Sequence, residues 1–259
     1  MNASRDSRTA VDKALALLDA FGEEHTTGVG VSELARRTNL SKSTAFRVLA
    51  MLERNGAVER AGIQYRLGPF VQRLSAPKAT SEDTLVRDTL TPFLVNLYER
   101  TRHTVHLAVL ERTDVIYLNK LHGLHQVPSP SRVGGRIPAY CTAVGKALLA
   151  YHPDEMEEVL GGELHQWTPH TVTDPQVLRQ QILRSREEGL AHDREEIMDG
   201  LHCVAAVVTS PTGGAVAAMS VSGPSGRFVP SQVAPALRAI CADAGRAYGQ
   251  RFRADRRAR

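Results

Sequence analysis

The chain has 259 residues, is 42% hydrophobic and 23% charged, and carries a formal net charge of +4 at pH 7. This length suits two domains, the composition excludes an intrinsically disordered chain, and the mildly basic balance permits a nucleic-acid partner. Cys141, Cys203 and Cys241 lie far apart and form no Cys-x-x-Cys pair, which argues against a disulfide framework and a cysteine zinc site.

The N-terminus is polar, with no apolar stretch typical of a signal peptide, and nothing in the sequence approaches the length of a membrane span. We therefore expect a cytoplasmic protein without a membrane partner.

Three helices are predicted at the start of the chain. Apolar residues recur at helical spacing between residues 9 and 21, which indicates the first helix. Ser32 is suited to cap a short second helix that turns Leu34 inward. Ser41 is suited to cap a third helix, which should end near Gly56.

After Gly56 the pattern changes to alternation. Residues 58–60 and 65–67 alternate around the turn-forming residues 61–64, which predicts a small hairpin. Three helices followed by a hairpin are typical of a winged helix-turn-helix.

The second domain mixes helices with strands, which places it in the α/β (α+β) class. We expect a long helix at 82–100, strands at 104–110 and 115–121, a helix from Thr142 to Tyr151, a helix at 174–188, paired strands at 203–209 and 215–222, and a last helix at 231–248. The strand at 203–209 is almost unbroken in its apolar character, so it should be buried on both faces.

The third helix has two chemically different sides when it is projected at 100° per residue. The apolar side holds Ala45, Val48, Leu49 and Leu52, and the opposite side holds Ser43, Arg47, Ala50 and Arg54. Arginine can pair bidentately with a guanine edge, so the second side can read a DNA groove.

Other residues near this helix are suited to the DNA backbone. Ser41, Lys42 and Thr44 are at the helix N-terminus, where free backbone amides favour phosphate. Arg60, near the hairpin tip, is placed to touch the flanking backbone or minor groove. A structural three-helix unit with a polar outer face is the alternative, and the hairpin and the two arginines weigh against it.

The chain resembles the IclR family of bacterial regulators over nearly its whole length. The resemblance is carried by residues 10–15, 17–18, 32–35, 40–44 with Arg47, Leu49 and Leu52, 65–68, 133–138, 142–150, 189–196 and 200–208. Their order and spacing together are specific. Residues 139–141 and Val208 depart from the family pattern, which affects details of the ligand pocket rather than the fold.

The resemblance implies a winged helix-turn-helix at 9–68, a linker helix at 69–81 and a GAF-like (profilin-like) effector-binding domain at 82–250. We expect a disordered arm at 1–8 and a basic tail at 251–259. The family also implies a homodimer or dimer of dimers on a palindromic double-stranded DNA operator, hence a nucleoid-associated protein when bound.

The resemblance further implies a small-molecule effector pocket in the second domain. Its expected residues are Gly135, Ala143, Val144, Asp193, Cys203, Ser220 and Ser222. Spacing along a strand independently places Ser220 and Ser222 on one face, with Met219 and Val221 on the other. As a hypothesis, Arg132, Arg136 and His122 supply positive charge for a small organic acid.

The residues also suggest other functions. The pairs His103-x-x-His106 and His122-x-x-His125 raise a metal-responsive regulator of the same fold, although a spacing of three on a strand puts His103 and His106 on opposite faces. An enzyme using Cys203 and His202 is less favoured, because adjacent strand residues face apart. A sensor without DNA binding is less favoured, because Lys42, Ser43 and Arg47 are all present. We predict no catalytic residue, no cofactor and no metal ligand.

Overall fold

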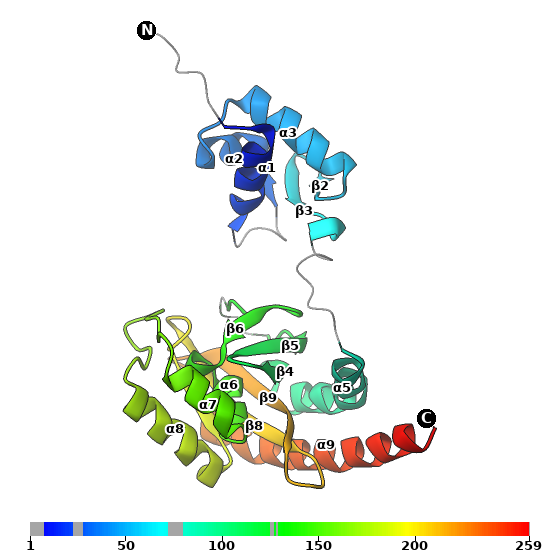
Figure 1. Ribbon diagram of the computed structural model, residues 1–259, viewed down its shortest axis with the longest axis vertical. Helices are drawn as coiled ribbons and strands as arrows, with labels where there is room; N and C mark the ends of the chain where they lie inside the picture. The colour runs from blue at the N-terminus through cyan, green and yellow to red at the C-terminus, as the bar shows by residue number, and fades with distance from the viewer. Residues whose placement is uncertain (1–7, 23–27, 72–79, 125–126, 128, 259) are drawn as a thin grey trace. The chain divides into compact units, whose positions relative to one another are not determined.

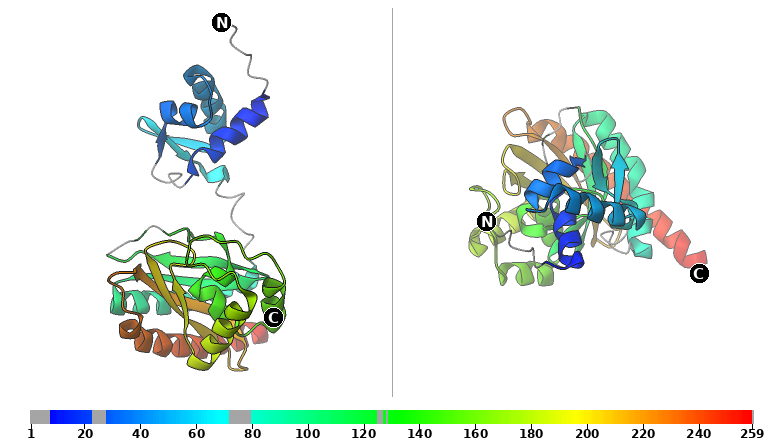
Figure 2. Two further views of the ribbon diagram at one scale, coloured as in Figure 1. Left: turned by 90° about the vertical axis from the view of Figure 1, so that its left-hand side faces the viewer. Right: turned by 90° about the horizontal axis from the view of Figure 1, so that it is seen from above.

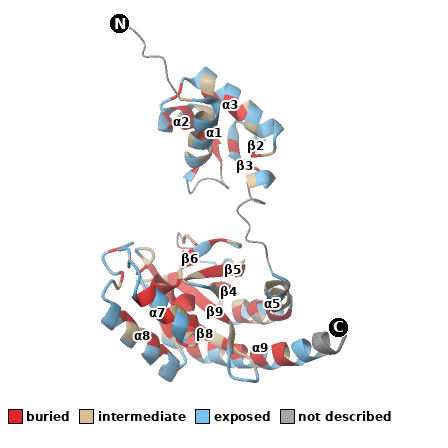
Figure 3. Cartoon of the chain, viewed as in Figure 1, coloured by how far each residue is buried: buried red, intermediate tan, exposed pale blue. Residues whose placement is uncertain are grey.

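The computed structural model describes residues 8–22, 28–71, 80–124, 127 and 129–258 and divides the chain into two compact units, Met1–Pro77 and Lys78–Arg259 (Figure 1). Each unit encloses its own hydrophobic core (Figure 3). None of the described helices is long and apolar enough to cross a membrane.

The N-terminal unit packs three helices against a small antiparallel sheet with strand order β1-β3-β2. The helices are α1 (Ala10–Asp19), α2 (Val31–Arg37) and α3 (Lys42–Arg54), and the strands are β1 (Val29–Gly30), β2 (Val58–Ala61) and β3 (Gln64–Leu67). The predicted three helices and hairpin are confirmed. The two-residue strand β1 was not expected, since it pairs with a segment more than thirty positions away, Val29 with Tyr65 and Gly30 with Gln64.

Two details of this unit differ from the sequence prediction. The expected Ser32 cap is wrong: α2 is capped by Gly30 without a side-chain hydrogen bond, because β1 runs directly into the helix. In α1, Val11 and Leu15 are 65% and 60% exposed, and Leu17 is fully buried instead.

Arg8 belongs to the segment expected to be a disordered arm. Its guanidinium nitrogens donate to the carbonyl oxygens of Thr38 at 2.8 Å and Asn39 at 3.1 Å, so this residue is tied to the turn before α3. Residues 1–7 lie outside the described residues.

The C-terminal unit is built on a six-stranded sheet with order β6-β5-β4-β9-β8-β7, antiparallel at every pairing. The strands are β4 (Thr104–Glu111), β5 (Asp114–Leu121), β6 (Arg136–Pro138), β7 (Ala191–Arg194), β8 (Leu201–Thr209) and β9 (Ala215–Pro224). Helices cover both faces of the sheet (Figure 2). One face carries α5 (Ser81–Thr101) and α9 (Pro230–Ala258), and the other carries η2 (Ala139–Cys141), α6 (Ala143–Leu149), α7 (Pro153–Leu160) and α8 (Pro175–Glu188).

Successive residues of β8 enter two different cores, as the period of two along a strand requires. Val204 and Val208 pack towards α5 and α9, whereas Cys203 and Ala205 pack towards α6. The prediction that this strand is buried on both faces is confirmed.

The short elements β6, β7 and α7 were not predicted. Asp193 was expected on a loop and lies on strand β7. The expected basic tail begins within α9, which remains helical as far as Ala258. The expected linker helix is described only at its start, Pro69 to Val71; α5 begins at Ser81 behind a Thr80 capping box.

Candidate functional site

Helix α3 has the two faces that its sequence predicts. Ala45, Val48 and Leu49 are buried, and Leu52 is half-buried. The Ser41 side chain accepts from the backbone amide of Thr44 at 3.2 Å and so caps the helix. The apolar face fixes α3 in the unit and leaves the other face outward.

The outward face of α3 carries exposed Ser43, Arg47 and Arg54, with half-buried Ala50 between them. A small residue there permits close approach of a partner to the helix axis. Next to the helix N-terminus the hydroxyl oxygens of Ser41 and Ser43 are 3.1 Å apart, and Ser41 donates to Thr44 Oγ1 at 2.8 Å.

The cations of α3 differ from their neighbours in their ion pairing. Within the described residues, Lys42, Arg47 and Arg54 have no ion-pair partner. Their neighbours differ: Arg36 is paired with Glu33 at 2.6 Å, and Arg66 with Glu59 at 2.7 Å. This distribution leaves positive charge available at α3 for a polyanion.

Arg60 lies on the hairpin beside α3 and is exposed. Its Nε donates to the Gly62 carbonyl oxygen at 3.0 Å, and its guanidinium carbon lies 6.0 Å from the centre of the Tyr65 ring. The hairpin turn therefore holds this cation near its tip.

A second site is a small cavity of about 20 Å³ in the C-terminal unit, between the sheet and the start of α6. Six of the seven expected effector residues line it: Ala143, Val144, Asp193, Cys203, Ser220 and Ser222. Gly135 is not among the lining residues; its carbonyl oxygen accepts from the Tyr117 amide at 3.3 Å.

Strand register brings these residues together. Asp193 pairs with Cys203, and Cys203 pairs with Ser222, so the three stand in one row across β7, β8 and β9. Two residues further along, on the same face of the sheet, His106 of β4 pairs with Ser220. Residues 114 positions apart in the chain therefore line one cavity.

His106 is a cavity residue that sequence reasoning did not assign. Its Nδ1 lies 3.2 Å from Ser220 Oγ and its Nε2 lies 2.8 Å from Ser131 Oγ. Burial, followed by the charge of Lys120, lowers the pKa of His106 to about 3, so the imidazole is neutral at neutral pH. Tyr117, Ser131 and Thr142 also line the cavity.

Asp193 is 1% exposed, and burial raises the pKa of its carboxyl to about 7. Its Oδ1 accepts from the Glu196 backbone amide at 2.8 Å. Burial, followed by the nearby Asp193, also raises the pKa of the Cys203 thiol, so this thiol is not poised as a nucleophile.

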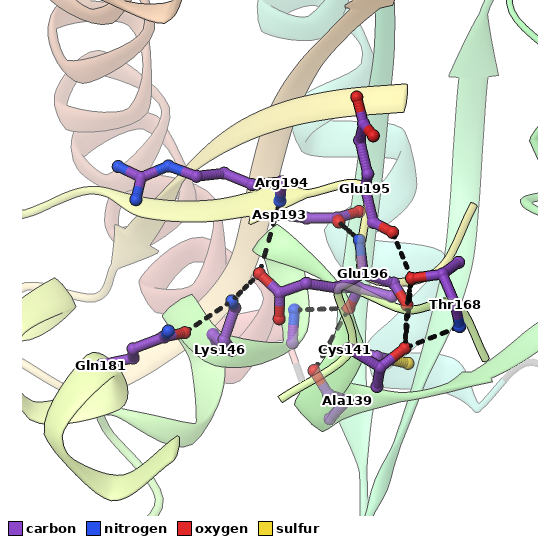
Figure 4. A network of polar contacts seen from close by, with 12 residues as sticks. Ala139, Cys141, Lys146, Thr168, Gln181, Asp193, Arg194, Glu195 and Glu196 are labelled. Carbon is purple, nitrogen blue, oxygen red and sulfur yellow. Dashed lines mark hydrogen bonds and ion pairs between the residues drawn. The ribbon is translucent and has the colours of Figure 1, made fainter. Parts of the chain in front are cut away.

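The wall behind Asp193 contains a buried ion pair (Figure 4). Lys146 Nζ donates to Glu196 Oε1 at 2.6 Å, with a further bond to Gln181 Oε1 at 3.1 Å. Glu196 Oε1 also accepts from the Arg194 backbone amide at 3.3 Å. These bonds fix the segment that follows Asp193.

The cations proposed for an organic acid do not line the cavity. Arg136 is half exposed and bonds to Glu111, and neither Arg132 nor His122 is among the lining residues. Lys120 is closer, since its Nζ donates to the backbone oxygen of Ser131 at 2.8 Å and to its Oγ at 3.1 Å.

The histidine pairs suggested by spacing do not form metal sites in the described residues. His106 lines the cavity, whereas the His103 ring packs on Phe228 with centroids 5.0 Å apart. His122 is exposed, and His125 lies outside the described residues.

Both units match known families. The sequence model for the IclR helix-turn-helix domain matches residues 10–62, and that for "Bacterial transcriptional regulator IclR C-terminal" matches residues 78–248. The chain is 34% identical over 227 residues to the HTH-type transcriptional regulator KdgR of Escherichia coli (strain K12), covering 86% of this chain and 85% of the relative.

Two solved structures are similar over nearly the full length. The Thermotoga maritima IclR has a TM-score of 0.68 and 31% identity, covering 92% of this chain and 98% of that one. An IclR homologue from Microbacterium hydrocarbonoxydans, complexed with 4-hydroxybenzoate, has a TM-score of 0.64 and 28% identity, covering 93% and 99%.

Proposed function

The chain belongs to the IclR family of bacterial transcriptional regulators, and on that premise we propose that it binds a palindromic operator and responds to a small organic acid. It is a DNA-binding regulator with a C-terminal effector domain and not an enzyme.

The observation that carries the DNA proposal is the unneutralised positive charge on α3. Arg47 and Arg54 are assigned to base edges in the major groove, and Lys42 with the hydroxyls of Ser41, Ser43 and Thr44 to phosphates. Arg60 is assigned to the flanking backbone or minor groove. A homodimer or dimer of dimers would present paired α3 helices to half-sites one helical turn apart, or a multiple of it.

The effector is assigned to the cavity lined by Asp193, Cys203, Ser220 and Ser222. Support comes from the buried polar groups there and from the 4-hydroxybenzoate complex of the Microbacterium hydrocarbonoxydans homologue. Lys120 contacts the cavity residue Ser131 through a hydrogen bond. We therefore assign the positive charge to Lys120 in place of Arg132, Arg136 and His122.

The small size of the cavity indicates how an effector would act on the protein. About 20 Å³ is room for little more than one water molecule, so an effector enters only if the wall moves. The protein then has two states, one with the wall open and one with it closed. An effector that binds the open state more tightly shifts the equilibrium towards it, by an amount set by the difference in affinity for the two states.

A gel-shift with the DNA upstream of the protein's own gene tests the proposal. We expect sequence-selective binding by the full chain, and a change in affinity when small aromatic and aliphatic carboxylates are added. Binding that ignores sequence contradicts the DNA proposal. A response only to uncharged compounds contradicts the organic-acid assignment.

A further inference from the structure

Three side chains with metal-binding atoms meet on the surface of the C-terminal unit, outside the effector cavity. His170, Glu195 and Asp199 each offer one ligand atom, and these atoms all lie within 4.8 Å of one another. His170 comes from the loop before α8, and the two carboxylates come from the connection between β7 and β8. None of the three lines the cavity.

The geometry is close to that of a bound ion. His170 Nε2 and Glu195 Oε2 are 3.5 Å apart. Bonds of about 2.1 Å to a divalent ion place neighbouring ligand atoms roughly 3.0–3.5 Å apart, so this pair already matches. Asp199 is exposed, and rotation of its side chain can supply the remaining approach.

Buried hydrogen bonds hold the two loops in this register (Figure 4). Thr168 Oγ1 donates to the Glu195 carbonyl oxygen at 2.6 Å, and Thr171 Oγ1 donates to the Glu196 carbonyl oxygen at 2.6 Å. Both threonines are 7% exposed. His170 lies between them in the chain, and its amide donates to Thr168 Oγ1 at 3.1 Å. The backbones of His170 and Glu195 are therefore positioned by the fold.

The ligand set selects a class of ion. One imidazole with two carboxylates suits Zn²⁺ or Mn²⁺, whereas Mg²⁺ prefers oxygen ligands alone.

We propose that His170, Glu195 and Asp199 bind one divalent transition-metal ion that clamps the loop before α8 onto the β7–β8 connection. Glu196, next to a ligand, donates its amide to Asp193 in the cavity wall. The bound ion would therefore stiffen the wall that an effector must move. Metal binding itself does not rest on the proposed function; only this coupling to the effector does.

The test uses the full chain without a tag, freed of metal by a chelator and dialysed. Calorimetric titration with ZnCl₂ and MnCl₂ should give one ion per chain at this site, with MgCl₂ giving no heat of binding. His170→Ala and Asp199→Asn should each weaken the affinity at least tenfold. At the same concentration, Zn²⁺ should raise the Tm of the wild type more than that of either variant.

His165→Ala is the matched control, because His165 is an exposed histidine of the same loop outside the cluster. It should bind Zn²⁺ as the wild type does. Circular dichroism of each metal-free variant checks that it folds. Absence of binding to the folded wild type overturns the proposal, as does equal binding by folded His170→Ala. Since no DNA is present, neither result bears on operator recognition.

Discussion

Lys146 of α6 and Glu196 of the β7–β8 connection form an ion pair with Nζ and Oε1 2.6 Å apart and side chains only 3% and 6% exposed. The pair ties α6, which starts at the cavity, to the segment that follows Asp193. Each charge depends on the other, because an unpaired charge in this position has no water to solvate it.

Removing one member of this pair should be far more harmful than removing both. Lys146→Met leaves the Glu196 carboxylate buried alone and should cost about 3–5 kcal/mol of stability. The double variant Lys146→Met, Glu196→Leu should lose less than the sum of the two single losses. Chemical denaturation followed by Trp167 fluorescence measures this, since Trp167 is the only tryptophan of the chain. Additive losses, within about 0.5 kcal/mol, would show that the two charges do not interact.

The Ser222 hydroxyl should lower the stability of the unliganded protein and strengthen effector binding. Its Oγ is buried beside the Cys203 thiol and has no hydrogen-bond partner of acceptable geometry among the described residues. Ser222→Ala removes this unsatisfied group and should stabilise the unliganded protein by about 1–3 kcal/mol. If the hydroxyl serves the effector, the same variant binds it more weakly by calorimetry. A variant that is destabilised and binds effector normally would contradict this role.

His106 should make the protein sensitive to acid. Its pKa is about 3 in the folded chain, below the usual 6.5, so between these pH values the unfolded chain binds more protons. The stability from burying neutral His106 is therefore complete above pH 6.5 and is lost as pH falls towards 3.

The variant His106→Gln isolates this effect from other titrating groups. The stability of the wild type minus that of the variant should be constant from pH 7 to 8 and should fall below pH 6.5, by at most about 1.4 kcal/mol per pH unit. Denaturation curves at several pH values provide the difference. A difference that does not change with pH would mean that His106 titrates normally in the folded chain.

Lys42 should contribute to binding of every DNA sequence. If it contacts phosphate, Lys42→Ala weakens operator and unrelated duplexes alike and reduces the slope of log affinity against log salt by about 1. Lys42→Arg keeps the charge and should keep the slope. Fluorescence anisotropy at several salt concentrations measures it, and an unchanged slope in Lys42→Ala would remove this residue from the interface.

Sequence alone predicts the features that depend on local pattern. The Ser41 cap follows from its residue type and the apolar stripe of α3 from helical spacing, and the shared face of Ser220 and Ser222 on β9 follows from the period of a strand. These signals lie within a few residues of one another, so no knowledge of distant contacts is needed.

Features that depend on distant contacts were not predictable in the same way. His106 reaches the cavity because β4 pairs with β9 in one particular register, and spacing along the chain grouped it with His103 instead. Strand β7 has four residues, too few for a clear alternation, so Asp193 was expected on a loop. His170 lies near Glu195 because hydrogen bonds from Thr168 and Thr171 hold two loops together, and no sequence motif predicts these bonds.

If the outward face of α3 reads DNA, the loss of Arg47 should change operator binding the most. The measurement is the affinity of the full chain, by anisotropy, for a duplex from upstream of its own gene and for a scrambled duplex. Arg47→Ala should weaken operator binding by about 5- to 150-fold, the equivalent of 1–3 kcal/mol, with a much smaller loss on scrambled DNA. Arg246→Ala removes the same charge from the other unit, where Arg246 is paired with Asp243, and should leave both affinities unchanged. Equal operator binding by Arg47→Ala and the wild type would contradict the claim.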